Sequence, residues 1–70
     1  MRIRISHPSH LLELSKALAA GNCLSLPVGT DALEVVDVGA DDAAQAERAL
    51  VFFLKAWQMA HPFIRAELIP

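Results

Sequence analysis

The sequence predicts an α+β domain, a two-layer sandwich in which two helices cover one face of a four-stranded antiparallel sheet. Three observations favour this class. Alternating polar and apolar residues indicate short strands, and apolar residues spaced three and four apart indicate two helices. The segments follow one another as strand, helix, strand, strand, helix, strand, which is typical of the split βαβ arrangement. A chain of 70 residues is expected to form a single domain over 1–70.

The first strand and the first helix come early in the chain. Residues 2–5 alternate between arginine and isoleucine, which indicates a half-buried strand. Pro8 favours a first helical turn and disfavours helical geometry in the residue before it, so we expect Ser6 or His7 to cap the helix. Leucines spaced three and four apart then form its buried face, and Gly21 is expected to end it in a left-handed conformation.

The segment after the first helix can be interpreted in two ways. Residues 23–28 alternate again, and we expect Leu24 and Leu26 to lie in the core. Pro27 has no N–H to donate, so this strand is expected at an edge of the sheet. The alternative is that the segment is a loop, which would leave a three-stranded βαβαβ unit.

The second half of the chain supplies two strands and a long helix. Residues 33–38 form the most regular strand pattern, and Asp42 is a suitable N-cap for a helix over 42–60. Pro62 stops that helix before a last strand over 64–69. The predicted core collects the apolar faces of all these segments: Ile3, Ile5, Leu11, Leu14, Leu18, Leu24, Leu26, Leu50, Phe53, Leu54, Trp57, Ile64 and Leu68.

This order of elements predicts a ferredoxin-like sheet, in which the first strand lies between the third and the fourth. Arg2 and Arg4 then lie beside Glu67 and Glu34 on the face without helices. Each opposite-charge pair across strands contributes roughly 0.2–1 kcal/mol. We interpret this face, which also includes Arg65, as solvated and charge-paired. The alternative is a second sheet that docks on it through Arg–Glu pairs.

The composition restricts the class of function. Apolar residues make up 54% of the chain and charged residues 20%, so we expect a homodimer that covers part of the apolar surface. The six Lys and Arg residues are scattered and the net charge is −2, which argues against nucleic-acid binding. Cys23 is the single cysteine, which excludes a disulfide framework and a CxxC site. No apolar run approaches the length of a membrane span, so we expect a cytoplasmic protein without membrane partners.

The turn from the first strand into the first helix resembles a motif of the ACT family of small-molecule-sensing domains. The family's Asp-x-Pro-Gly-x-Leu stretch corresponds here to Ser6-His7-Pro8-Ser9-His10-Leu11, followed by a Leu- and Ala-rich helix and a Gly-Asn step. Ser6 stands at the family's acidic position and Ser9 at its glycine position. The resemblance implies a paired, ferredoxin-like module that binds a small polar metabolite near Ser6, His7, Ser9, His10 and Leu11.

No catalytic or metal site is expected. The topology places His7, His10, His61 and Asp31 at one end of the molecule, which leaves a His-based zinc module as a minor alternative. Helix ends and turns attract these residue types for structural reasons, and the spacing matches no strong metal motif. Cys23 lies away from the histidines and is expected to be structural. We therefore expect no enzyme, no metal and no cofactor.

Three residues of the second helix lie outside its core face. Phe52 and Met59, with Val51 at the margin, are predicted to form a dimer contact, because aromatic and methionine side chains are enriched at interfaces. Simple surface exposure is the alternative. The sequence thus favours a non-enzymatic, homodimeric, ACT-like ligand-sensing or regulatory module. A structural or accessory protein that docks on a larger partner through this helix is the second hypothesis.

Overall fold

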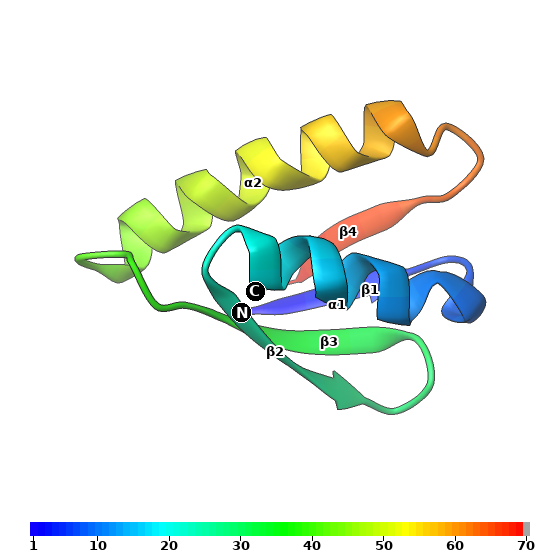
Figure 1. Cartoon of the computed structure of the whole chain (residues 1–70), viewed down its shortest axis with the longest axis horizontal. Helices are drawn as coiled ribbons and strands as arrows, with labels where there is room; N and C mark the ends of the chain where they lie inside the picture. Colours follow the sequence, from blue (N-terminus) through cyan, green and yellow to red (C-terminus); the bar gives the residue numbers. More distant parts are fainter. Residues whose placement is uncertain (70) are drawn as a thin grey trace.

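The computed structural model describes residues 1–69, and these residues form four strands and two α-helices (Figure 1). The element order matches the one expected from the sequence. The presence of the second strand rules out the three-stranded alternative. The strands are β1 (Arg2–Ile5), β2 (Cys23–Val28), β3 (Ala32–Asp37) and β4 (Ala66–Ile69); the helices are α1 (Leu11–Ala20), which follows a 3-10 turn, η1 (Pro8–His10), and α2 (Ala43–Ala60).

The four strands form one antiparallel sheet in the order β2-β3-β1-β4. The expected position of β1, between β3 and β4, is confirmed, and this order is compatible with a ferredoxin-like topology. Strands β2 and β4 form the two edges. Pro27 lies in edge strand β2, opposite Leu33 of β3, where a missing N–H is tolerated if it points away from the ladder.

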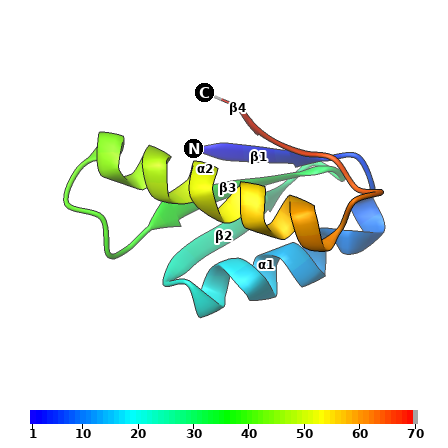
Figure 2. The ribbon, with the colours of Figure 1, turned by 90° about the horizontal axis from the view of Figure 1, so that it is seen from above.

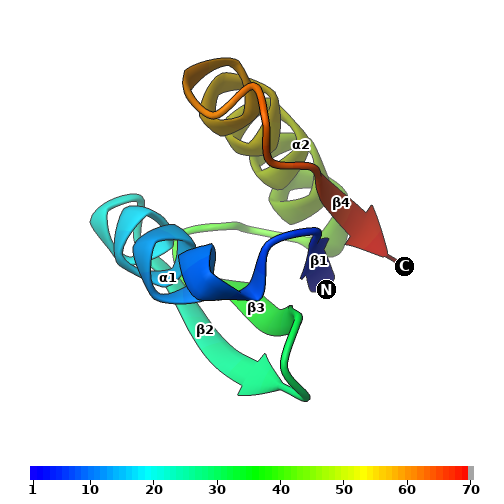
Figure 3. The same ribbon diagram turned by 90° about the vertical axis from the view of Figure 1, so that its right-hand side faces the viewer.

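Both helices lie on the same face of the sheet (Figure 3). Helix α1 packs over β2 and β3, whereas α2 packs over β4 and β3. Figure 2 shows that the two helices run in opposite directions, so the start of α1 and the end of α2 come to the same end of the molecule. Within residues 1–69, neither helix combines the length and the hydropathy that crossing a membrane requires.

The core lies between the sheet and the two helices. Most of the predicted core residues are buried there, and Leu11, Phe53 and Leu68 pack against its margin. The prediction for Leu24 and Leu26 was wrong, because both side chains are 67% exposed on the face without helices. The buried apolar side chains are Ile3, Ile5, Leu14, Leu18, Cys23, Ala32, Leu33, Val35, Leu50, Leu54, Trp57 and Ile64.

The pairing register explains why the leucines of β2 face away from the helices. Ser25 pairs with Val35, and Leu24 pairs with Val36, so the buried Val35 fixes Ser25 on the helix side. There the Oγ atoms of Ser25 and Ser15 of α1 form a hydrogen bond of 2.7 Å. Successive strand residues alternate between faces, so this pairing places the neighbouring leucines on the opposite face.

The ends of the helices differ in detail from the expectations. No side-chain hydrogen bond caps the 3-10 turn at its N-cap, His7, and Ser6 bonds elsewhere, so neither predicted cap is formed. Gly21 has a φ of −96°, and it is Asn22, with a φ of 65°, that adopts the left-handed conformation. The predicted cap Asp42 is confirmed, because its carboxylate accepts the backbone N–H of Gln45 at 2.7 Å.

The last strand begins later than expected, at Ala66 and not at residue 64. The backbone N–H of Ile64 donates to the carbonyl of His61 at 3.0 Å, which holds residue 64 in the turn that follows α2. Its side chain is nevertheless buried, as predicted.

Candidate functional site

Ser6, at the end of β1, joins the first candidate segment to the start of β4. Its backbone N–H donates to the carbonyl of Arg65 at 2.8 Å, and its Oγ accepts the N–H of Arg65, also at 2.8 Å. The same Oγ lies 2.8 Å from Nδ1 of His7. Ser6 therefore serves the backbone at the position where the ACT motif has an acidic residue.

A polar recess of about 440 Å³ opens beside Ser6. Strand β1, the β2–β3 turn and the start of β4 meet there, and they bring guanidinium groups and carboxylates together. Arg4 Nε lies 3.9 Å from Asp31 Oδ2, a loose ion pair between half-exposed groups that leaves both groups accessible. The polar side chains that line the recess are Arg4, Ser6, Thr30, Asp31, Arg65 and Glu67.

The other four predicted ligand residues do not line this recess. Ser9 is exposed on the 3-10 turn, and Leu11 packs against the core margin. The rings of His7 and His10 face each other edge-on, with their centroids 6.3 Å apart. Of the five predicted ligand residues, Ser6 alone lies at the recess, although Pro8 of the same motif also lines it.

The sequence predicted part of this lining but did not recognise it as a site. Arg4, Arg65 and Glu67 were expected on one face of the sheet, and the register places Glu67 opposite Arg4. Asp31 is far from these residues along the chain, and the assembled sheet brings it and Ser6 to the same recess.

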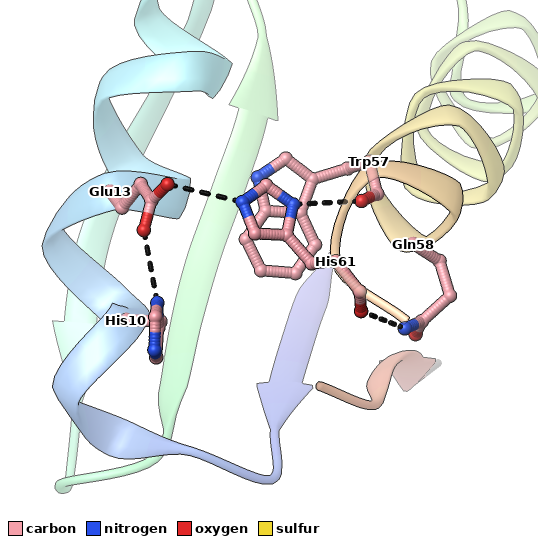
Figure 4. A network of polar contacts seen from close by, with 5 residues as sticks. All are labelled: His10, Glu13, Trp57, Gln58 and His61. Carbon is pink, nitrogen blue, oxygen red and sulfur yellow. Dashed lines mark hydrogen bonds and ion pairs between the residues drawn. The ribbon is translucent and has the colours of Figure 1, made fainter. Parts of the chain in front are cut away.

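A second polar cluster joins the two helices (Figure 4). Glu13 of α1 contacts His10 through Oε2, 3.0 Å from Nδ1, and contacts His61 through Oε1, 3.1 Å from Nε2. Nδ1 of His61 lies 2.9 Å from the carbonyl oxygen of Trp57, and the two rings stack with centroids 4.0 Å apart. Both ring nitrogens of His61 face acceptors, so the imidazolium form makes both hydrogen bonds.

This arrangement shifts two pKa values. The hydrogen bonds from His10 and then His61 lower the pKa of Glu13 below its ordinary value. The carbonyl of Trp57 and then the carboxylate of Glu13 raise the pKa of His61 above its ordinary value. Folding therefore favours the ion pair between Glu13 and a protonated His61.

We expect stability to be highest in mildly acidic solution. The raised pKa of His61 contributes stability that is fully present below 6.5 and is lost as the pH rises through the higher folded value. The lowered pKa of Glu13 contributes stability that is present above 4.5 and is lost as the pH falls through the lower folded value. Thermal unfolding measured between pH 4 and pH 9 should thus give the highest midpoint between about 4.5 and 6.5, with a decline toward pH 8.

Glu13→Gln is the control for this profile. The amide keeps the shape of the side chain but removes the charge, so the decline above pH 6.5 should become smaller; it should not vanish, because the carbonyl of Trp57 remains. An unchanged decline in the variant would show that Glu13 and His61 do not cause the pH dependence.

The histidines do not form a metal centre with their neighbours. In the part of the chain that the structure describes, no three or more His, Cys, Asp or Glu side chains are arranged to hold a metal ion. Asp31 pairs with Arg4, whereas His10 and His61 both contact Glu13.

Cys23 is buried at the start of β2, with Sγ 3.8 Å from the carbonyl oxygen of Gly21. Burial raises the pKa of the thiol, and the carboxylate of Asp37 raises it further. A nucleophilic cysteine needs the opposite shift.

The candidate interface on α2 is exposed. Phe52 and Met59 are 78% and 83% exposed, and Val51 is exposed at the margin. Val51 and Met59 also line an apolar groove of about 470 Å³ between α2 and β4, whereas Phe52 lies outside it.

The chain matches no protein-family model, no curated protein and no solved structure.

Proposed function

We propose that the chain is a non-enzymatic regulatory module of ferredoxin-like topology, ACT-like in its general plan, that binds a small zwitterionic metabolite in the recess beside Ser6. The observation that carries this proposal is the presence of both signs of charge around one small opening, with Arg4 and Arg65 beside Asp31 and Glu67. A zwitterion such as a free amino acid needs both signs within a few ångströms.

The two ends of such a ligand would use different side chains. Arg65 is exposed and, among residues 1–69, makes no ion pair, so its guanidinium is available to a carboxylate. Arginine binds carboxylates through two parallel N–H donors. Asp31 and Glu67 would receive the ammonium group, a role that the ACT motif gives to the residue at the position of Ser6.

NMR titration with individual amino acids tests the proposal. We expect the amides of Ser6, Thr30, Asp31 and Arg65 to shift with at least one amino acid. The matching amine and the matching carboxylic acid, each lacking one charge, should shift them much less. A library of amino acids that leaves all four amides unmoved would contradict the proposal.

Arg65→Ala measures the contribution of the guanidinium. We expect the affinity to fall at least tenfold, since a hydrogen bond to a charged group contributes roughly 1.5–3 kcal/mol. Arg48→Ala on α2 is the matched control, because it removes an exposed guanidinium away from the recess and should leave the affinity unchanged.

Docking on a larger partner through α2 is the second candidate function. It is favoured by the exposure of Phe52 and Met59 and by the apolar groove beside Met59. A Phe52→Asp variant tests this surface, because it should weaken docking through α2 and leave contacts made by the sheet unchanged.

A further inference from the structure

The face of the sheet that carries no helix has an exposed apolar stripe. Leu24 and Leu26 of β2 lie beside Val36 of β3, and the backbone N–H of Val38 donates to Asn22, which continues the same ladder by one step. The exposed fractions of Leu24, Leu26, Val36 and Val38 run from 58% to 67%. We call these four residues the apolar stripe. A contiguous group of exposed large apolar side chains is typical of an interaction surface.

Charged residues occupy the adjoining half of this face, and their signs alternate. Arg2 of β1 pairs in register with Glu34 of β3, and Arg4 pairs with Glu67 of β4. The contact between Arg2 Nη2 and Glu34 Oε1 is 3.8 Å, which is loose, and Glu34 Oε2 also lies 3.2 Å from the ammonium group of Met1. Two positive and two negative side chains therefore lie next to one another beside the apolar stripe.

We propose that a second copy of this chain docks on this face, sheet against sheet, about a two-fold axis. A two-fold interface places the same patch on both sides, so the patch must complement itself. An apolar stripe can lie against its own copy, and a block that mixes arginines and glutamates can place each charge opposite one of the other sign. A strongly basic or strongly acidic partner would meet repulsion from half of these groups.

The size of the face limits the area that this pairing can bury. Two strands of six residues and two of four, spaced about 4.8 Å apart with about 3.4 Å per residue, give a flat footprint of roughly 330 Å². Side-chain relief enlarges the buried area, but the interface stays near the lower end of those that bury about 1,200–2,000 Å² in total. We therefore expect a weak, reversible association, with a mass that rises with concentration.

This pairing deepens the proposed function, because Arg4 and Glu67 belong both to the recess and to the charged half of the face. A second copy would cover the recess and would link ligand binding to assembly. The pairing itself needs no ligand, so the two proposals can fail separately.

Sedimentation equilibrium from about 1 µM to 1 mM, without added ligand, tests the pairing across the micromolar range. We expect the wild-type mass to rise from monomer to dimer. Leu26→Lys should weaken the association at least tenfold. Leu12→Lys on α1 is the matched control, since Leu12 is also 67% exposed, and it should leave the association unchanged, as should Phe52→Asp. A wild-type chain that stays monomeric to 1 mM, or one whose dimer is lost in Phe52→Asp and kept in Leu26→Lys, would overturn the proposal.

Charge exchange provides a second test that does not depend on the apolar stripe. A chain with Arg2→Glu and Arg4→Glu, and another with Glu34→Arg and Glu67→Arg, should each be monomeric because like charges face each other. Mixed in equal amounts, they should form a heterodimer. If the mixture stays monomeric while each chain remains folded by circular dichroism, the charged half does not face its copy.

Discussion

Leu18→Ala should lower the free energy of unfolding by about 3–5 kcal/mol, the upper range for a leucine truncated in a closed core. Leu18 is fully buried between α1 and the sheet. A 70-residue domain has little stability in reserve, of the order of 5 kcal/mol. We therefore expect this variant to be largely unfolded at 37 °C. Urea unfolding followed through Trp57 fluorescence at 10 °C and 25 °C measures the loss.

Leu24→Ala is the matched control for this experiment. It removes the same atoms from a side chain that is 67% exposed, so its cost should stay below about 0.5 kcal/mol at concentrations where the chain is monomeric. The regular alternation of β2 predicts a core position for Leu24, and on that basis the two variants would be equally unstable. Equal losses would show that β2 pairs in the other register.

Gln58→Glu should give the second large effect, a loss of about 2–4 kcal/mol at pH 7. The side-chain amide of Gln58 ties the end of α2 to β4. Its Nε2 donates to the carbonyls of His61 and Ile64, and its Oε1 accepts the N–H of Ala66 at 2.9 Å. A carboxylate keeps the acceptor but directs negative charge at two carbonyl oxygens in a half-buried site.

Two comparisons test whether the lost hydrogen bonds cause the destabilisation in Gln58→Glu. Gln45→Glu makes the same chemical change where Oε1 only accepts the N–H of Asp41, at an exposed helix start that tolerates negative charge, so its effect should be small. Lowering the pH to 4 should restore part of the stability of Gln58→Glu relative to wild type, because a protonated carboxyl regains one donor. A cost that does not depend on pH would mean that packing, and not hydrogen bonding, sets the effect.

Local signals in the sequence were sufficient to predict the helices and strands of the fold. Asp42 capped its helix as expected, and Leu50, Leu54 and Trp57 formed its buried face. The face that β2 turns toward the helices could not be predicted, because alternation shows that Leu24 and Leu26 share a side but does not say which side. That choice depends on the pairing of Ser25 with Val35, which is a tertiary contact.

The candidate site, too, was predicted only in part from the sequence. Ser6 was predicted as a ligand residue from a short motif, which stays a prediction, and the histidines were correctly expected at one end of the molecule. The partner that joins two of them was missed, since Glu13 and His61 are 48 positions apart and Glu13 lies on an exposed helix face that has no motif. The strand order and the proximity of Arg4 to Glu67 were predicted, whereas the recess that these residues share with Ser6 and Asp31 was not.

Pro27 has a further consequence for how copies of this chain can associate. Edge strand β2 is rich in leucine, and such edges can recruit identical strands one after another and so nucleate fibrils. A proline in the middle of that edge removes one of the N–H donors that an incoming strand would need. Growth along the edge is thereby obstructed, while the broad face beside it stays open. Pro27 thus disfavours the addition of further strands along edge β2.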